Sequence, residues 1–305
     1  MSTPVFREAI STHLCLPSPA CKDRVGERIG RTTVDLFGDK IQAEALQGDG
    51  WRIKHDKTKL QLNRLFTWCR VPSVCEVFGL FANLIPQEGL NRLERGRKRH
   101  AMFPDFRLEL PEQNGSSYVL AELKIINYCP TQYQPDKEMR AVDKRARQLP
   151  GEYRKKAEDA DSDYGGVPRR EVGPVQRKLQ TFGELRGLVF GNFSEASQGV
   201  HDLIRIMSES RLAAQGLKTG IQGRKEALGQ ITGQLRRLIS VTVTRAIAES
   251  LLSRTDQIGG GHREANKRRQ WALHEDERMR KERIASFISQ KRGVNVLRRG
   301  FFRLN

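Results

Sequence analysis

Two runs of alternating apolar and polar residues follow each other closely between residues 102 and 127. The first run carries Pro104-Asp105, the second carries Glu122 and Lys124, and the polar stretch Glu112–Ser117 separates them. Successive side chains of a strand point to opposite faces, so Glu122 and Lys124 share one face. The pattern predicts two strands joined by a turn, and if these strands pair as neighbours, Asp105 can reach Glu122.

Helical spacing of apolar residues marks the segments on both sides of these strands. Upstream, Lys59–Cys69 and Ser73–Leu84 each have apolar residues at helical spacing, and Pro72 between them predicts two separate helices. Downstream, the charged stretch Asp136–Asp161 is interpreted as a helix. Further along, Leu228–Leu252 shows the same spacing and predicts a long amphipathic helix.

A third strand is predicted at the short apolar run Leu185–Phe190, with Ser194 as the expected N-cap of the helix after it. The order helix, strand, strand, helix, strand, helix predicts an α/β fold with a small mixed sheet flanked by helices. We expect three regions. Residues 1–57 form a partly ordered arm, residues 58–215 form the α/β core, and residues 216–305 form a basic helical C-terminal extension.

The charge of the chain is strongly basic and uneven. The formal net charge is +18 and the isoelectric point is about 10.1. Residues 216–305 carry 20 Lys/Arg against 8 Asp/Glu, a net charge of +12, which favours contact between this tail and nucleic-acid phosphates. A solvated helical face, or a nuclear localisation signal at residues 267–269, would also account for the charge. The candidate phosphate contacts in the tail are Arg268, Arg269, Arg298 and Arg299.

Membrane and secretory features are not evident in the sequence. No run of 18 or more apolar residues occurs, and the first residues lack the apolar stretch of a secretory signal. The odd number of cysteines, five, predicts reduced thiols. We expect a nuclear or cytoplasmic protein that is not secreted and has no membrane partner.

The two acids and the lysine on the two predicted strands suggest a metal site that could catalyse hydrolysis. Carboxylates such as Asp105 and Glu122 are the oxygen ligands that Mg²⁺ prefers, and Lys124 beside them could help to activate a water molecule or hold a phosphate. The alternative is structural. A Glu-x-Lys pair on a strand is often a solvated ion pair, and Pro-Asp often simply begins a strand.

The residues Pro104, Asp105, Glu122 and Lys124 resemble the motif of the PD-(D/E)XK nuclease superfamily, which has the restriction-endonuclease-like fold. The resemblance covers about residues 60–215. It implies that Asp105 and Glu122 bind Mg²⁺ or Mn²⁺, with the Leu123 carbonyl as a further ligand, and that Lys124 assists the attacking water.

The resemblance also implies two features upstream of Asp105. A further acid often comes from a helix there, and Glu76 in Ser73–Leu84 is the candidate. The family usually places another strand before the one that carries the first acid. No strand is evident in the polar and basic segment Gln87–His100.

The helix expected after the second motif faces the metal in this superfamily. Its polar residues Arg145, Gln148, Tyr153 and Lys156 are therefore candidate contacts to DNA phosphate. The segment 173–197 and the Arg-rich end of the chain are also similar to segments in open reading frames of eukaryotic mobile elements.

Taken together, these patterns favour a Mg²⁺-dependent endonuclease that hydrolyses DNA, in the setting of a mobile element. Two alternatives remain open at this stage. One is a nucleic-acid-binding protein on the same fold without catalysis, and the other is an RNA-associated assembly factor that uses the basic tail. The expected partners are DNA, with RNA as the alternative, and proteins of a mobile-element or nucleic-acid-processing complex.

Overall fold

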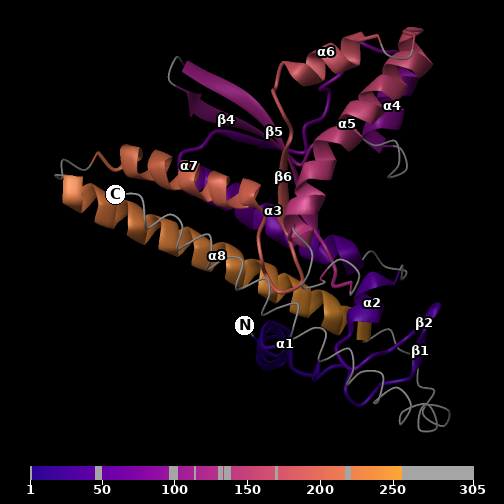
Figure 1. The fold of residues 1–305 in the computed structure, drawn as a ribbon, viewed down its shortest axis with the longest axis vertical. Helices are drawn as coiled ribbons and strands as arrows, with labels where there is room; N and C mark the ends of the chain where they lie inside the picture. Colours follow the sequence, from indigo (N-terminus) through magenta and orange to yellow (C-terminus); the bar gives the residue numbers. More distant parts are fainter. Residues whose placement is uncertain are drawn as a thin grey trace.

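A computed structural model describes residues 2–44, 50–95, 102–112, 115–129, 133, 139–168, 171–216 and 221–255. The described chain is a mixed α/β protein with a small mixed sheet (Figure 1). None of its described helices is both long enough and apolar enough to cross a membrane. Arg268, Arg269, Arg298 and Arg299 lie outside the described residues.

Four strands form the central sheet in the order β3-β4-β5-β6. β3, β4 and β5 are antiparallel neighbours, whereas β6 pairs with β5 in parallel. A parallel neighbour requires a crossover connection, and α5 and α6 provide it. The strands are β3 (Ser73–Cys75), β4 (Phe106–Glu112), β5 (Gly115–Ile125) and β6 (Arg186–Phe190). The predicted strands at both acid motifs and at Leu185–Phe190 are therefore confirmed.

Helices cover both faces of this sheet (Figure 1). One face packs on α3 (Gly50–Trp68), α7 (Gln198–Ala214) and α8 (Ile221–Thr255) through one apolar cluster. The other face packs on α4 (Gln87–Arg95), α5 (Ala141–Gly165) and α6 (Pro174–Gln180) through a second cluster. The helices predicted at Lys59–Cys69, Asp136–Asp161 and Leu228–Leu252 overlap α3, α5 and α8, but α3 already begins at Gly50, α5 begins only at Ala141, and α8 extends from Ile221 to Thr255.

The helix predicted at Ser73–Leu84 is wrong. Ser73–Cys75 is strand β3, and the chain then turns, with Glu76 and Gly79 at positive φ. The strand exists because β3 pairs with β4, Ser73 opposite Leu108 and Cys75 opposite Phe106. These hydrogen bonds come from residues 31 to 35 positions away, so the local apolar spacing could not indicate them. The segment Gln87–His100, in which no strand was evident, begins with a helix over Gln87–Arg95, and residues 96–100 lie outside the described residues.

The predicted N-cap at Ser194 is also wrong. Ser194 has a left-handed backbone, φ 61°, and α7 begins at Gln198 with Ser197 as its N-cap. The Ser197 hydroxyl does not cap the helix. It instead donates to the Gly187 carbonyl (3.0 Å) and accepts from the Val189 N–H (3.1 Å), which ties the start of α7 to β6.

Residues 2–44 are folded onto the rest of the protein rather than forming a partly ordered arm. They contain α1 (Thr3–His13), the hairpin β1 (Arg28–Ile29) with β2 (Thr32–Thr33), and α2 (Asp39–Ala43). This N-terminal unit lies against α8 near its C-terminal end (Figure 1), where Leu251 joins Cys21 and Ile41 in a small buried cluster. The packing of α8 on α3 and α7 likewise places residues 221–255 in the core, so no boundary separates core from tail at residue 216.

Candidate active site

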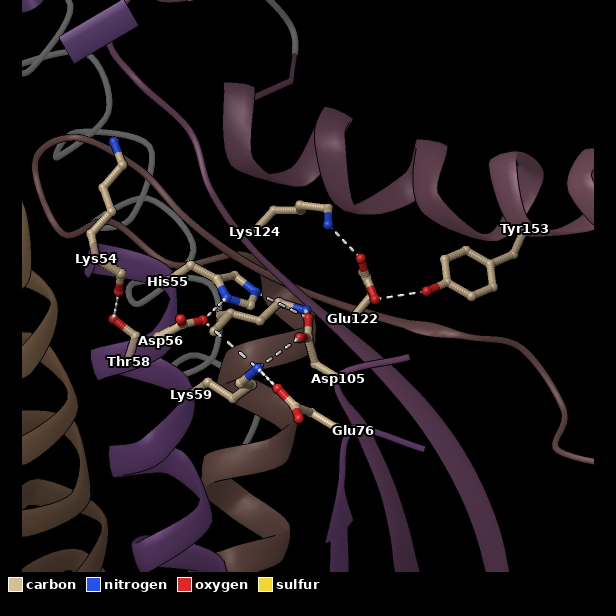
Figure 2. A network of polar contacts seen from close by, with 11 residues as sticks. Lys54, His55, Asp56, Thr58, Lys59, Glu76, Asp105, Glu122, Lys124 and Tyr153 are labelled. Carbon is tan, nitrogen blue, oxygen red and sulfur yellow. Dashed lines mark hydrogen bonds and ion pairs between the residues drawn. The ribbon is translucent and has the colours of Figure 1, made fainter. Parts of the chain in front are cut away.

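The two acids predicted from the sequence face each other across β4 and β5. Phe106 pairs with Ala121, and continuing this antiparallel register by one residue sets Asp105 opposite Glu122. Both side chains are almost fully buried, with 6% and 7% of their surface exposed. Charged carboxylates are rarely this buried unless they have polar partners, so their contacts define the site (Figure 2).

Asp105 is held by the backbone of β5 and by two side chains of α3. Its Oδ2 accepts from the Leu123 N–H (2.9 Å) and contacts Nε2 of His55 (3.2 Å). Its Oδ1 lies 3.9 Å from Nζ of Lys59. Burial by itself would raise the pKa of Asp105, but the hydrogen bond and charge of His55, the Leu123 N–H and Lys124 outweigh it and lower the pKa. Asp105 is therefore a readily ionised carboxylate.

Glu122 has different neighbours. Its Oε2 accepts from the hydroxyl of Tyr153 on α5 (2.7 Å), and its Oε1 accepts a short hydrogen bond from Lys124. Burial raises the pKa of Glu122, and the negative charge of Asp105 adds to this, so the pKa stays above its usual value although Lys124 and Tyr153 oppose the shift. The two acids thus differ in proton affinity, as expected for neighbouring carboxylates.

Lys124 is placed as predicted, on the same strand face as Glu122 and in contact with it. About 38% of its side chain is exposed, so its ammonium group lies at the edge of the site and can reach solvent. This pair is not an ordinary ion pair on a solvent-exposed strand face, because Glu122 is buried.

Glu76 reaches the site from an unexpected element. It directly follows β3 rather than lying on a helix, and its N–H donates to the Asp105 carbonyl (2.9 Å). Its half-exposed side chain pairs with Nζ of Lys59 (2.6 Å). Lys59 therefore joins Glu76 to Asp105, with Glu76 at the margin of the site.

The four residues of α5 that were predicted to contact phosphate lie in different environments. Tyr153 is buried and bonded to Glu122, so its prediction as a surface contact is wrong. Arg145 pairs with Glu152 (3.0 Å between Nη2 and Oε2), and Gln148 is exposed. Lys156 is half-buried beside the Tyr153 ring, and burial lowers the pKa of its ammonium group. The Leu123 side chain lies in the core, and a role for its carbonyl stays a prediction.

Two residues of the site, His55 and Lys59, were not anticipated. They lie one helical turn apart on α3, and both point toward Asp105 (Figure 2). His55 also contacts Asp56 through Nδ1 (2.9 Å). Burial by itself lowers the pKa of His55, but its hydrogen bond to Asp105 and the charge of that carboxylate raise it overall. The spacing of four residues on a helix was the only sequence signal, and it is typical of any solvated helix face.

The donor groups at the acid pair determine which metal ion the site could hold. Within the described ranges, no three His, Cys, Asp or Glu side chains already form a metal-binding group. Cationic groups instead neutralise the acids, Lys59 and His55 at Asp105 and Lys124 at Glu122. Two facing buried carboxylates are hard oxygen donors, and a divalent cation would supply the positive charge that these side chains now provide. The donor chemistry therefore fits Mg²⁺ or Mn²⁺.

Comparisons with known proteins give no relative from which a function could be transferred. No protein-family model matches the chain, and neither a curated protein nor a solved structure matches it significantly. A functional assignment must therefore come from the site itself.

Proposed function

We propose that this protein is a metal-dependent endonuclease of the PD-(D/E)XK superfamily that hydrolyses DNA phosphodiester bonds. One observation carries the proposal: two buried carboxylates, Asp105 and Glu122, face each other on paired strands, with Lys124 beside Glu122 at the solvent edge. Burying two carboxylates lowers the stability of a fold, and such buried acid pairs are found most often at functional sites.

The topology around the acids supports the same assignment. The segment from β4 to α7 contains two antiparallel strands, the crossover helices α5 and α6, a parallel strand and a further helix, which agrees with the order strand, strand, helix, strand, helix that the resemblance implies. β3 supplies the strand before the first acid, and Glu76 at its end supplies an additional carboxylate near Asp105.

Each side chain can be given a role in this reaction. Asp105 and Glu122 would hold the metal ion, which would supply positive charge to offset the charge developing on the phosphate. Lys124 would orient the attacking water and contact the phosphate with its ammonium group. As the water oxygen bonds to phosphorus and the phosphorus–oxygen bond to the leaving strand breaks, the proton of the water would pass to solvent. Tyr153 positions Glu122, and His55 positions Asp105, through their hydrogen bonds.

The test is cleavage of supercoiled plasmid DNA by the purified protein. We expect nicking with Mg²⁺ or Mn²⁺ and none with EDTA. Asp105→Asn should abolish nicking, because the neutral amide is a poor metal ligand. Lys124→Met should slow it about 100-fold or more, because removal of one preorganised donor to the reacting phosphate typically costs at least this factor.

A matched control distinguishes loss of the metal ligand at Asp105 from the mere removal of one negative charge. Asp163→Asn removes an acid that is half-exposed on α5 and paired with Arg92, without touching the acid pair, so it should cut like the wild type. Nicking that survives in Asp105→Asn would refute this active site. A wild-type protein that binds DNA without nicking it would favour a binding protein on the same fold.

A further inference from the structure

An exposed aromatic side chain lies in the turn that follows β3. Phe78 comes two residues after Glu76, and 57% of its surface is exposed. Its ring packs on that of Phe103, with centroids 4.3 Å apart and planes tilted by 42°. Phe103 directly precedes Pro104-Asp105, so both rings belong to segments that also carry acids of the site.

The backbone holds Phe78 firmly in this position. The N–H of Glu76 donates to the Asp105 carbonyl (2.9 Å), and the N–H of Val77 donates to the Pro104 carbonyl (3.3 Å), so the ladder between β3 and β4 continues up to the turn. The Phe78 N–H then donates to the Glu76 carbonyl (2.9 Å). The side chain of Val77 is buried in the apolar cluster beneath.

The turn orients the ring outward through an uncommon backbone. Glu76 has φ 55° and Gly79 has φ 67°, so left-handed residues stand on both sides of Phe78. A non-glycine residue with positive φ is uncommon and marks a conformation that the surrounding structure enforces. Burying a phenylalanine side chain is worth about 1.5–3 kcal/mol, so holding Phe78 exposed in an ordered turn forgoes stability.

We propose that Phe78, backed by Phe103, stacks on an unpaired base of the DNA strand whose phosphate lies at the acid pair. The inference rests on the proposed function and specifies its substrate class: single-stranded DNA or a duplex with an unpaired segment. In an intact duplex the neighbouring base pairs cover both faces of each base, so a ring has no face to join. An unpaired base offers a free face, and such stacking contributes about 1–3 kcal/mol per base.

Phe78 lies close to the site along the chain. It follows Glu76 by two residues, so the Cα atoms of these two residues lie at most about 7 Å apart. Lys59 and Lys124 provide positive charge at the acid pair for the adjoining phosphate. Aromatic stacking combined with cationic backbone contacts is the usual way in which proteins bind single strands.

Binding in EDTA tests the inference without cleavage. The probes are a fluorescein-labelled single-stranded oligonucleotide and the blunt duplex of the same sequence, read by fluorescence anisotropy. Phe78→Ala should weaken single-strand binding about 5- to 150-fold, the factor corresponding to the loss of one stacked base. Duplex binding should change by less than about twofold. Phe78→Trp should keep single-strand binding, because indole also stacks.

Phe6→Ala is the matched control, because Phe6 has nearly the same exposure, 56%, and lies on α1, which packs on α8. It should leave both affinities unchanged. Equal losses on both probes for Phe78→Ala, or no loss on the single strand, would overturn the inference. Because no cleavage is measured, a protein that never nicks plasmid DNA but shows the single-strand loss refutes only the proposed reaction. A protein that nicks and shows no such loss refutes only the stacking role.

Discussion

Asp105 and Glu122 occupy equivalent places on paired strands, yet their proton affinities shift in opposite directions. Asp105 accepts from a backbone N–H and contacts His55, so its pKa is lowered despite burial. The interactions of ionised Asp105 therefore stabilise the fold above the ordinary pKa of aspartate. This stabilisation is lost as pH falls through the lowered pKa. Burial raises the pKa of Glu122. The protonated, buried Glu122 therefore stabilises the fold at low pH, and this stabilisation is lost as pH rises through the raised pKa.

The contact between His55 and Asp105 gives a prediction at the residue scale. In metal-free protein, Asp105→Asn should lower the pKa of His55, because burial continues to disfavour the imidazolium while the carboxylate charge is gone. The measurement is a titration of the imidazole nitrogens by NMR. In the wild type the charged pair stabilises the fold below the ordinary histidine pKa and ceases to do so as pH rises through the raised value.

His201 on α7 serves as the internal reference for that titration. Burial lowers its pKa, and Asp105 is not among the groups that shift it. Its titration should be identical in both proteins. An unchanged pKa of His55 in the variant would mean that the contact with Asp105 does not form in solution.

At the scale of elements, the close approach of α5 to β6 positions Tyr153 over Glu122. Gly187 pairs with Glu122 across the strands, and a Cβ atom at Gly187 would lie 2.8 Å from the backbone of Ala146 on α5. Such a contact is too short for any real Cβ atom, so glycine permits this spacing of helix and sheet. The hydroxyl of Tyr153 reaches the acid because the helix lies so near.

Gly187→Ala should destabilise the protein by about 1–3 kcal/mol, the usual range for overpacking a core, because α5 must move away from β6. Gly229→Ala on α8 is the matched control, since a Cβ there has no neighbour within 4 Å. It should stabilise the helix by up to about 1 kcal/mol. Urea unfolding measures both, and similar stabilities for the two variants would contradict the packing argument.

At the scale of the whole molecule, α8 joins the N-terminal unit to the layer that carries His55 and Lys59. Its buried residues Leu235, Ile239, Val243 and Ile247 belong to the same core cluster as α3. At its end, Arg254 donates to the carbonyls of Ile41 and Glu44 (2.7 Å each). Deleting residues 216–305, the basic tail as the sequence suggested it, would therefore remove part of the core.

Truncation after Thr255 tests the charge of the remaining tail. Residues 256–305 carry 13 Lys/Arg against 6 Asp/Glu, a net charge of +7. If they contact phosphates, the truncated protein should bind DNA more weakly, and its affinity should depend less steeply on salt, by about 0.9 in the log–log slope per lost contact. Salt titrations by fluorescence anisotropy measure both slopes, with circular dichroism to check folding. Equal slopes would exclude phosphate contacts by this segment.

The sequence alone determined the parts of the protein that depend on local pattern. Alternation identified β4 and β5, helical spacing identified part of α3 and most of α8, and strand parity placed Lys124 beside Glu122. It also indicated that Asp105 and Glu122 could meet, because a short turn between two strands makes antiparallel neighbours.

Only the tertiary structure decided what depends on residues distant in sequence. β3 is a strand because β4 pairs with it, although its own apolar spacing favoured a helix. His55, Lys59 and Tyr153 become part of the site because α3 and α5 pack on opposite faces of the sheet and meet at the two acids. The N-terminal residues fold because α8 offers an apolar surface, and no local pattern among residues 1–57 could reveal that surface.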